Sequence, residues 1–309
     1  MSIPGSSSLP LHLFDFVNRA DELDRFRALV EQPLEARRER ILIFHGPAGI
    51  GKTLLLDRIA HECSLRAIPM ARISFEGGQK NDYLRIMRAI RDQLDAADFA
   101  DWTELVNYYY PGRPMAVLTV RVESAPGQSQ VNIQAENVTV QGDIVGGNKI
   151  EIRDNFIVIP RADVDLTLIQ DSLTDKFIEV VGRFVQSKPV FFLFDSVDHD
   201  DFDLLTRQWL WQNLIDRASK LGGLGLVPVI ALVQRPRLER ALEVYTKQQE
   251  LKPLSQEHVE EYLRRRGVPA ELVPGAASTI LVTTDCSPDQ VFQVTEKLLE
   301  RLAQKGPGR

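Results

Sequence analysis

Cysteine is scarce in this chain, and this scarcity excludes a disulfide-stabilised scaffold. The 309 residues include two cysteines, Cys63 and Cys286, which lie far apart in the sequence. We expect both to be free thiols in a reducing compartment. The five histidines form no cluster with cysteines or carboxylates at metal-ligand spacing, so the sequence does not indicate a zinc-type centre.

Long apolar segments are also missing. The longest apolar run, Leu221 to Val233, is too short to span a bilayer and is broken by glycines and Pro228. The first residues lack the charged-then-apolar pattern of a secretory signal. We therefore expect a cytoplasmic protein with no membrane partner.

The chain carries no excess of positive charge. It has 37 Lys and Arg against 43 Asp and Glu, a net charge of −6 and a pI near 5.5. This balance weakens a general nucleic-acid-binding role without excluding a local basic face. The length allows one large domain or two modest ones with a sizeable core.

A glycine-bearing loop follows the apolar run of residues 41–45. The loop reads Gly46-Pro47-Ala48-Gly49-Ile50-Gly51-Lys52-Thr53 and matches G-x-x-x-x-G-K-[ST] at every fixed position. This pattern, between a strand and a helix start, predicts a phosphate-binding loop. An ordinary strand-to-helix turn is the alternative, and both flanking elements count against it.

The residue types explain how such a loop would bind a nucleotide. Glycines let successive backbone N–H groups turn toward phosphate oxygens, and the helix expected over residues 54–63 directs its positive end at the same anion. Lys52 would reach the β- and γ-phosphates, and the Thr53 hydroxyl would bind Mg²⁺. The chain has no guanine-reading N-K-x-D motif, so we expect ATP or ADP with Mg²⁺.

A carboxylate at the end of a second apolar strand would complete the metal site. Residues 191–194 are apolar and are followed by Asp195, so Asp195 is predicted to hold Mg²⁺ through its water shell. The alternative is a strand-end aspartate that caps a turn.

Asp198 has two interpretations that the sequence leaves open. It would polarise the attacking water, or it would be one more member of the acidic cluster Asp195, Asp198, Asp200 and Asp201. Ser196 stands where a glutamate base usually follows the metal-binding aspartate, which favours slow hydrolysis.

The strand expected over residues 229–233 ends in Gln234, Arg235 and Pro236. A cation at the end of a neighbouring strand can sense the γ-phosphate, and Arg235 is the first candidate, with Gln234 second. The alternative is a surface arginine.

Hydrophobic periodicity predicts an α/β fold with a parallel sheet of about five strands flanked by helices. Besides residues 41–45, strands are expected at residues 71–75, 189–195 and 227–233, and helices at residues 16–30, 81–97, 102–110, 166–185, 202–221 and 238–244. A helical lid is expected from residue 253, with helices at 256–265, 272–281 and 288–302.

These elements suggest a division into parts: a loose N-terminus at 1–11, an ATPase core at 12–110 and 161–252, a lid at 253–303 and a tail at 304–309. Residues 111–160 alternate apolar and polar residues between turn signals and predict an insertion of two or three β-hairpins. The insertion would be a surface flap, or an edge for oligomerisation or partner binding.

Together these motifs resemble the AAA+-like signal-transducing P-loop ATPases known as the STAND class, which includes the NACHT and NB-ARC switches and has Orc-like relatives. Residues 16–23 are similar to the family's F-V-G-R-E-x-E-L segment, with Asn18 in place of Gly and Ala20 in place of Glu. Because that segment packs near the adenine in the family, the resemblance implies that Arg19 contacts the nucleotide.

The resemblance continues along the chain. Residues 194–198 are similar to the class's hhhhD-[DG]-h-D form, Gln234-Arg235 match its strand-end sensor arginine, and residues 251–255 resemble the start of its lid. The segment 286–288 stands at the lid's G-x-P position, with Cys286 in place of Gly, and implies that Pro288 contacts the nucleotide. Residues 141–150 are similar to G-D-x-V-G-G-D-K-I segments of bacterial signalling and conflict proteins.

The resemblance implies an ATP-binding, slowly hydrolysing switch that self-associates or works with a separate sensor or effector protein. Arg264, Arg265 and Arg266 would act as arginine fingers toward a neighbouring subunit, or form an ordinary basic helix face. Two alternatives stay open: a nucleic-acid-dependent loader or transposition helper that uses residues 37–40 and 264–266, and a scaffold whose nucleotide never turns over.

Overall fold

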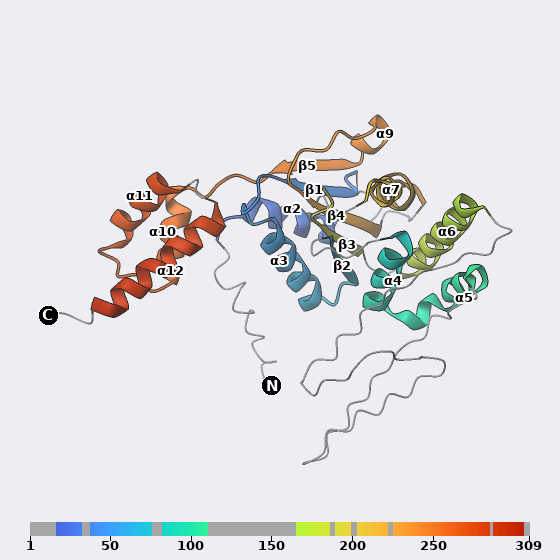
Figure 1. Ribbon diagram of the computed structural model, residues 1–309, viewed down its shortest axis with the longest axis horizontal. Helices are drawn as coiled ribbons and strands as arrows, with labels where there is room; N and C mark the ends of the chain where they lie inside the picture. The colour runs from blue at the N-terminus through green and yellow to red at the C-terminus, as the bar shows by residue number, and fades with distance from the viewer. Residues whose placement is uncertain are drawn as a thin grey trace, which may run out of the picture. The chain divides into compact units, whose positions relative to one another are not determined.

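A computed structural model describes residues 17–32, 38–75, 82–110, 165–185, 189–198, 203–221, 225–284 and 287–305 (Figure 1). The expected loose N-terminus at 1–11 and the expected β-rich insertion at 111–160 lie outside these residues, as do Asp200, Asp201 and Cys286. Within the described part of the chain, every helix is too short or too polar to cross a bilayer.

The central element is a sheet of five strands in the order β2-β3-β4-β1-β5, in which every neighbouring pair is parallel. The strands are β1 (Ile41–His45), β2 (Met70–Ser74), β3 (Val190–Asp195), β4 (Leu226–Leu232) and β5 (Thr246–Glu250). The predicted α/β fold with about five parallel strands is confirmed.

The strand register brings the carboxyl ends of the strands to one edge. His45 at the end of β1 lies opposite Leu232 of β4, and Ser74 of β2 lies opposite Asp195 of β3. The polar residues that follow β1, β3 and β4 therefore gather at this edge, which is where ligands bind in open parallel sheets.

Strand β5 has no counterpart among the strands expected from the sequence. Its residues, Thr-Lys-Gln-Gln-Glu, contain no apolar side chain and are only partly buried. It pairs with β1 at the edge of the sheet, where only one side of the strand has a strand partner. Hydrophobic periodicity therefore carries no signal for this strand.

The helices agree with the expected order. They are α2 (Ala20–Glu31), α3 (Lys52–Leu65), α4 (Tyr83–Leu94), the 3₁₀ turn η2 (Ala96–Phe99), α5 (Ala100–Tyr109), α6 (Leu166–Phe184), α7 (Leu204–Trp209), α8 (Asp216–Leu221), α9 (Arg240–Glu243), α10 (Gln256–Arg265), α11 (Val273–Thr283) and α12 (Pro288–Lys305). The single helix expected over 202–221 is interrupted between α7 and α8 by a π-helical segment, η3 (Leu210–Ile215). Helix α3 begins at Lys52, two residues before its expected start.

The chain divides into two compact units, residues 97–176 and the remainder. In the smaller unit the fully buried Trp102 of α5 donates its indole N–H to the carbonyl of Leu173 at 3.1 Å. This hydrogen bond satisfies the one polar atom of the ring.

In the larger unit, α2 and α3 pack on the sheet through a common apolar cluster. Phe26 of α2 meets Phe191 of β3 with ring centroids 5.0 Å apart, and Leu55 and Ile59 of α3 are fully buried in the same cluster. Cys63 of α3 is buried there as a free thiol, and burial raises its pKa to about 12. Helices α10, α11 and α12 share a separate apolar cluster, which includes Leu263, Val273 and Val291.

The fully buried position of Leu55 sets up a packing test. We expect Leu55→Ala to lower the free energy of unfolding by about 2–5 kcal/mol, because it leaves a cavity between α3 and the sheet. The matched control is Leu205→Ala on α7, whose side chain is 77% exposed. Urea denaturation of both variants measures the difference, and equal losses would contradict this packing.

Candidate functional site

The loop at residues 46–53 has the backbone that its glycines permit. Gly49 and Gly51 adopt φ values of 75° and 90°, a region that other residues seldom enter. Pro47, Ala48 and Gly49 are exposed at the tip of the loop, whereas Ile50 is buried in the core cluster. One end of the loop is thus fixed in the core while its tip stays open to a ligand.

Helix α3 begins directly under this loop. Gly51 is its N-cap and supplies no side-chain hydrogen bond to the first turn. The first N–H groups of the helix therefore lack a side-chain cap, as at an anion-binding helix end. The side chain of Thr53 is exposed in this first turn.

Lys52 is folded back on the loop. Its Nζ donates to the carbonyl oxygens of Gly46 and Pro47 at 2.7 and 2.9 Å, and the residue is only 9% exposed. If a phosphate bound in the loop, it would have to replace these two carbonyls as the hydrogen-bond partner of Lys52.

Asp195 ends strand β3 and is almost fully buried. Its Oδ2 lies 3.4 Å from a guanidinium nitrogen of Arg72, and its Oδ1 accepts a long 3.4 Å hydrogen bond from Ser196 Oγ. Ser196 has φ of 59°, so the chain turns sharply after the carboxylate.

These residues fit a magnesium ion better than a protein-only metal centre. Among the described residues, no three His, Cys, Asp or Glu side chains are grouped to hold a metal. Mg²⁺ takes hard oxygen ligands, keeps several waters and shares substrate phosphates. The Thr53 hydroxyl and the Asp195 carboxylate are oxygen ligands of this kind. The exposed tip of the glycine loop leaves room for the phosphates.

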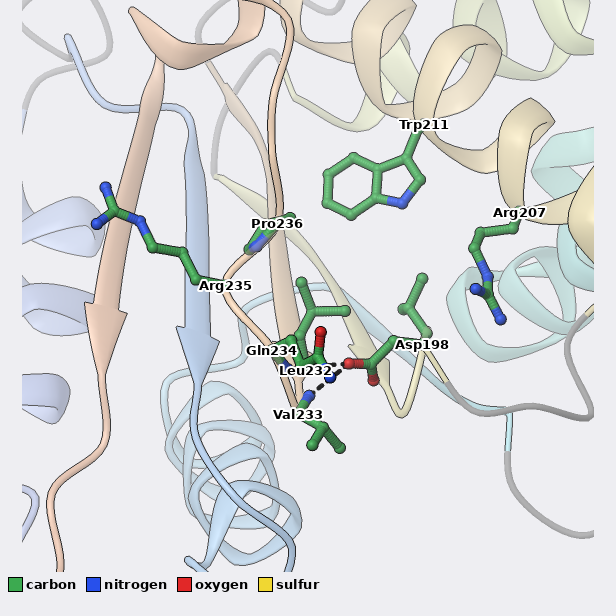
Figure 2. A pocket seen from close by; sticks show the side chains of 9 residues that line it. Asp198, Arg207, Trp211, Leu232, Val233, Gln234, Arg235 and Pro236 are labelled. Atoms are coloured by element: carbon green, nitrogen blue, oxygen red, sulfur yellow. Dashed lines mark hydrogen bonds between the residues drawn. The ribbon is translucent and has the colours of Figure 1, made fainter.

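Asp198 uses its two oxygens differently. Oδ2 accepts hydrogen bonds from the backbone N–H groups of Val233 and Gln234 at 2.6 and 3.1 Å, which holds the chain at the end of β4 (Figure 2). Oδ1 is buried and has no hydrogen-bond partner among the described residues. One oxygen of Asp198 therefore stabilises the end of β4, and the other is an acceptor without a donor among the described residues.

A cavity of about 570 Å³ adjoins Asp198. Its lining comes from the ends of β3 and β4 and from the helical stretch after β3: Val197, Asp198, Arg207, Trp211, Leu232, Val233, Gln234, Arg235 and Pro236. The sequence analysis did not single out Arg207 or Trp211, because both lie inside an expected helix and belong to none of the motifs.

Arg235 points away from Asp198 (Figure 2). Its Nε donates to Gln248 of β5 at 3.1 Å, and the side chain is exposed. The nearby His45, at the end of β1, has its pKa lowered by burial, opposed by the charge of Glu250 and reinforced by that of Arg235. Arg235 thus lies on the β5 side of the strand ends.

Arg19 is buried rather than open to solvent. It is 3% exposed, and its guanidinium donates to the carbonyls of Ile50 at 2.8 Å and Lys252 at 3.0 Å. Burial lowers its pKa. Asn18 has φ of 57° and accepts from the Arg19 N–H, which explains why Asn replaces Gly at this position. Arg19 links the loop at residues 46–53 to the segment after β5.

The start of α12 touches the other side of the loop. The Asp289 N–H donates to the carbonyl of Gly49 at 3.3 Å, and a Cβ added to Gly51 would lie 3.4 Å from Cγ of Pro288. Pro288 was expected near the nucleotide; Asp289 was not. The only sequence signal for Asp289 is an acidic residue in the first turn of a predicted helix.

A comparison of the sequence with models of protein families identifies the family of this chain. The model of the AAA ATPase domain matches residues 15–227, more than half of the chain. The chain belongs to the AAA ATPase domain family. The expected resemblance to AAA+-like P-loop ATPases is confirmed.

Solved structures with low sequence identity show similarity to this AAA ATPase chain. A chain of the E. coli HORMA:CdnC:Trip13 complex is 11% identical (TM-score 0.44; 93% of this chain and 90% of that chain). Cdc6p from Pyrobaculum aerophilum is 13% identical (TM-score 0.48; 98% and 65%). A STAND protein with a tetratricopeptide repeat sensor from Pyrococcus horikoshii is 12% identical (TM-score 0.42), and this chain spans only 28% of its length. A search of curated proteins found no match.

The basic stretch at residues 264–266, at the end of α10 of this AAA ATPase, is engaged in ion pairs. Arg264 pairs with Glu260 at 2.7 Å, Arg265 pairs with Glu261, and Arg266 pairs with Glu296 of α12. Nearby glutamates therefore balance the charge of this stretch. This arrangement favours the ordinary basic helix face over the arginine fingers.

The Arg19 contacts generate a stability test. We expect Arg19→Met to lower the free energy of unfolding by about 2–4 kcal/mol, since the buried carbonyl of Ile50 and the partly buried carbonyl of Lys252 lose a charged donor. Arg19→Lys should recover only part of this, because an ammonium lacks the planar fork that reaches both carbonyls. Urea denaturation measures the loss. Arg25→Met on α2, the helix that follows Arg19, is the control, and a loss no larger than that of the control would contradict the Arg19 contacts.

Proposed function

We propose that this AAA ATPase domain protein is a nucleotide-controlled switch. It binds ATP with Mg²⁺ at residues 46–53, hydrolyses it slowly, and passes the state of the nucleotide to its C-terminal helical region, α10–α12. Membership of the family supports ATPase chemistry. The switch, the slow rate and the residue roles are our proposal.

Each proposed binding role starts from a side chain at the strand-end edge. Lys52 would exchange its two loop carbonyls for phosphate oxygens. Thr53 and Asp195 would hold Mg²⁺, which neutralises phosphate charge when bound. Arg235 would have to leave Gln248 before it could sense the γ-phosphate.

One observation carries the switch proposal: the loop is linked to the C-terminal helical region at two places, the start of α12 and, through Arg19, the segment just before α10. The Gly49 carbonyl accepts from Asp289 at the start of α12, and Arg19 joins the Ile50 carbonyl to that of Lys252, just before α10. A ligand that reshapes this loop changes both contacts. If the nucleotide binds one arrangement of the loop and helical region more tightly than another, it shifts the equilibrium toward that arrangement.

The strand-end residues favour slow turnover. Ser196 stands directly after Asp195, where a glutamate would be the stronger base. Asp198 keeps one oxygen bonded to the end of β4, and its other oxygen, Oδ1, is buried and would have to become accessible before it could polarise a water. An acceptor that is partly engaged polarises water less effectively than a free carboxylate.

The partner would be another protein rather than a nucleic acid. The net charge is −6, and glutamates pair with the arginines at 264–266. The likeness of residues 141–150 to segments of bacterial signalling and conflict proteins favours a prokaryotic signalling or defence context, with self-association or a separate sensor or effector.

The phosphate-binding loop and the carboxylate can be tested by rate. We expect Lys52→Ala and Asp195→Ala each to lower ATP hydrolysis by about 100-fold, because each removes charge stabilisation at the transferring phosphoryl group. Phosphate release measures the rate, and Lys247→Ala on β5 serves as the lysine control.

The outcomes separate the three candidate functions. Turnover lost in both variants, with a nucleotide-dependent change in size or shape of the parent, supports the switch. Tight nucleotide binding without phosphate release supports the scaffold. Hydrolysis that depends on added DNA, with salt-sensitive binding, supports the nucleic-acid-dependent ATPase.

A further inference from the structure

Arg72 joins the two elements that supply the proposed metal ligands. It lies on β2, and its guanidinium pairs with Asp57 of α3 and, at 3.4 Å, with Asp195 of β3. Asp57 lies four residues after Thr53, so the two side chains project from the same face of α3. None of the sequence motifs includes Arg72 or Asp57.

The backbone of Arg72 is held in place independently of its charge. Strand β2 is at the edge of the sheet, so its outward backbone groups have no strand partner. Gln93 of α4 satisfies both groups of Arg72: its Oε1 accepts from the Arg72 N–H at 2.8 Å, and its Nε2 donates to the Arg72 carbonyl at 3.0 Å. The backbone from which the guanidinium reaches Asp195 is thereby fixed.

The burial of Asp195 makes this ion pair consequential. The Asp195 side chain is 2% exposed, whereas that of Arg72 is 24% exposed. A buried carboxylate is costly without a cation or several donors. Among the ion pairs of the described residues, the one that includes Asp195 is the pair with Arg72.

We infer that Arg72 is a positioning residue that serves as the counter-ion of Asp195 when Mg²⁺ is absent and competes with Mg²⁺ for this carboxylate. Two cations near one carboxylate repel each other, so Mg²⁺ binding weakens the Arg72–Asp195 pair. Arg72 then keeps its ion pair with Asp57. This inference rests on the proposed function, because it assigns Mg²⁺ to Asp195.

The test is the Mg²⁺ dependence of nucleotide binding by the full chain. Fluorescence of methylanthraniloyl-ATP is followed while Mg²⁺ is titrated into the parent protein, Arg72→Met and the control Arg58→Met. Arg58 is a matched control because its side chain is 21% exposed and pairs with Glu62 on the same helix as Asp57. We expect half-saturation at about tenfold lower Mg²⁺ in Arg72→Met, since a nearby positive charge is removed, and no change in the control.

Thermal unfolding provides a readout that a merely structural arginine would not move. Arg72→Met should lower Tm more in EDTA than in saturating Mg²⁺ and nucleotide, because Mg²⁺ replaces the missing counter-ion. Asp57→Asn should raise the Mg²⁺ half-saturation, since Arg72 then pairs with Asp195 alone. This effect should vanish in the Arg72→Met background.

The outcomes are distinguishable from failure of the proposed function. If the parent shows no Mg²⁺-dependent nucleotide binding, the proposed function fails. If the parent binds but Arg72→Met keeps the parental half-saturation and loses equal Tm in both buffers, the inference is overturned. If Arg72→Met does not fold, Asp57→Asn decides: an unchanged Mg²⁺ half-saturation in that variant also overturns the inference.

Discussion

Parallel strand pairing is the constraint on which the site depends. Because all pairs in the sheet are parallel, β1, β3 and β4 end at one edge, where the glycine loop, Asp195 and the turn after β4 meet. Asp198 reinforces the edge by bonding the backbone at the end of β4. The position of the site therefore follows from the parallel pairing of the strands.

The glycine loop also joins parts of the chain that lie far apart in sequence. Arg19 and Asp289 reach it from opposite ends of the described chain and bond to the carbonyls of Ile50 and Gly49. A change in the backbone conformation of the loop would reorient these carbonyls and so alter their hydrogen bonds. In our proposal, the same backbone that would bind phosphate reports its occupancy to α12 and to the segment before α10.

Local patterns predicted much of this structure from the sequence. The apolar runs identified β1, β3 and β4, and the glycine spacing identified the loop before α3. Strand β5 escaped because its residues are polar, and the π-helical segment η3 has no periodic signal that distinguishes it from a helix. Arg72, Asp57 and Asp289 acquire their places only through tertiary contacts. The burial of Arg19 and its two hydrogen bonds to distant carbonyls likewise depend on the fold.

The central claim is that the nucleotide acts through the contact between the loop and the first turn of α12. Amide hydrogen exchange of the loop and of the start of α12, compared without nucleotide, with Mg²⁺ and ADP, and with Mg²⁺ and a non-hydrolysable ATP analogue, tests it most directly. The account predicts that protection changes in both segments and differs between the two nucleotides. A change confined to the loop, with α12 the same in all three states, would contradict it.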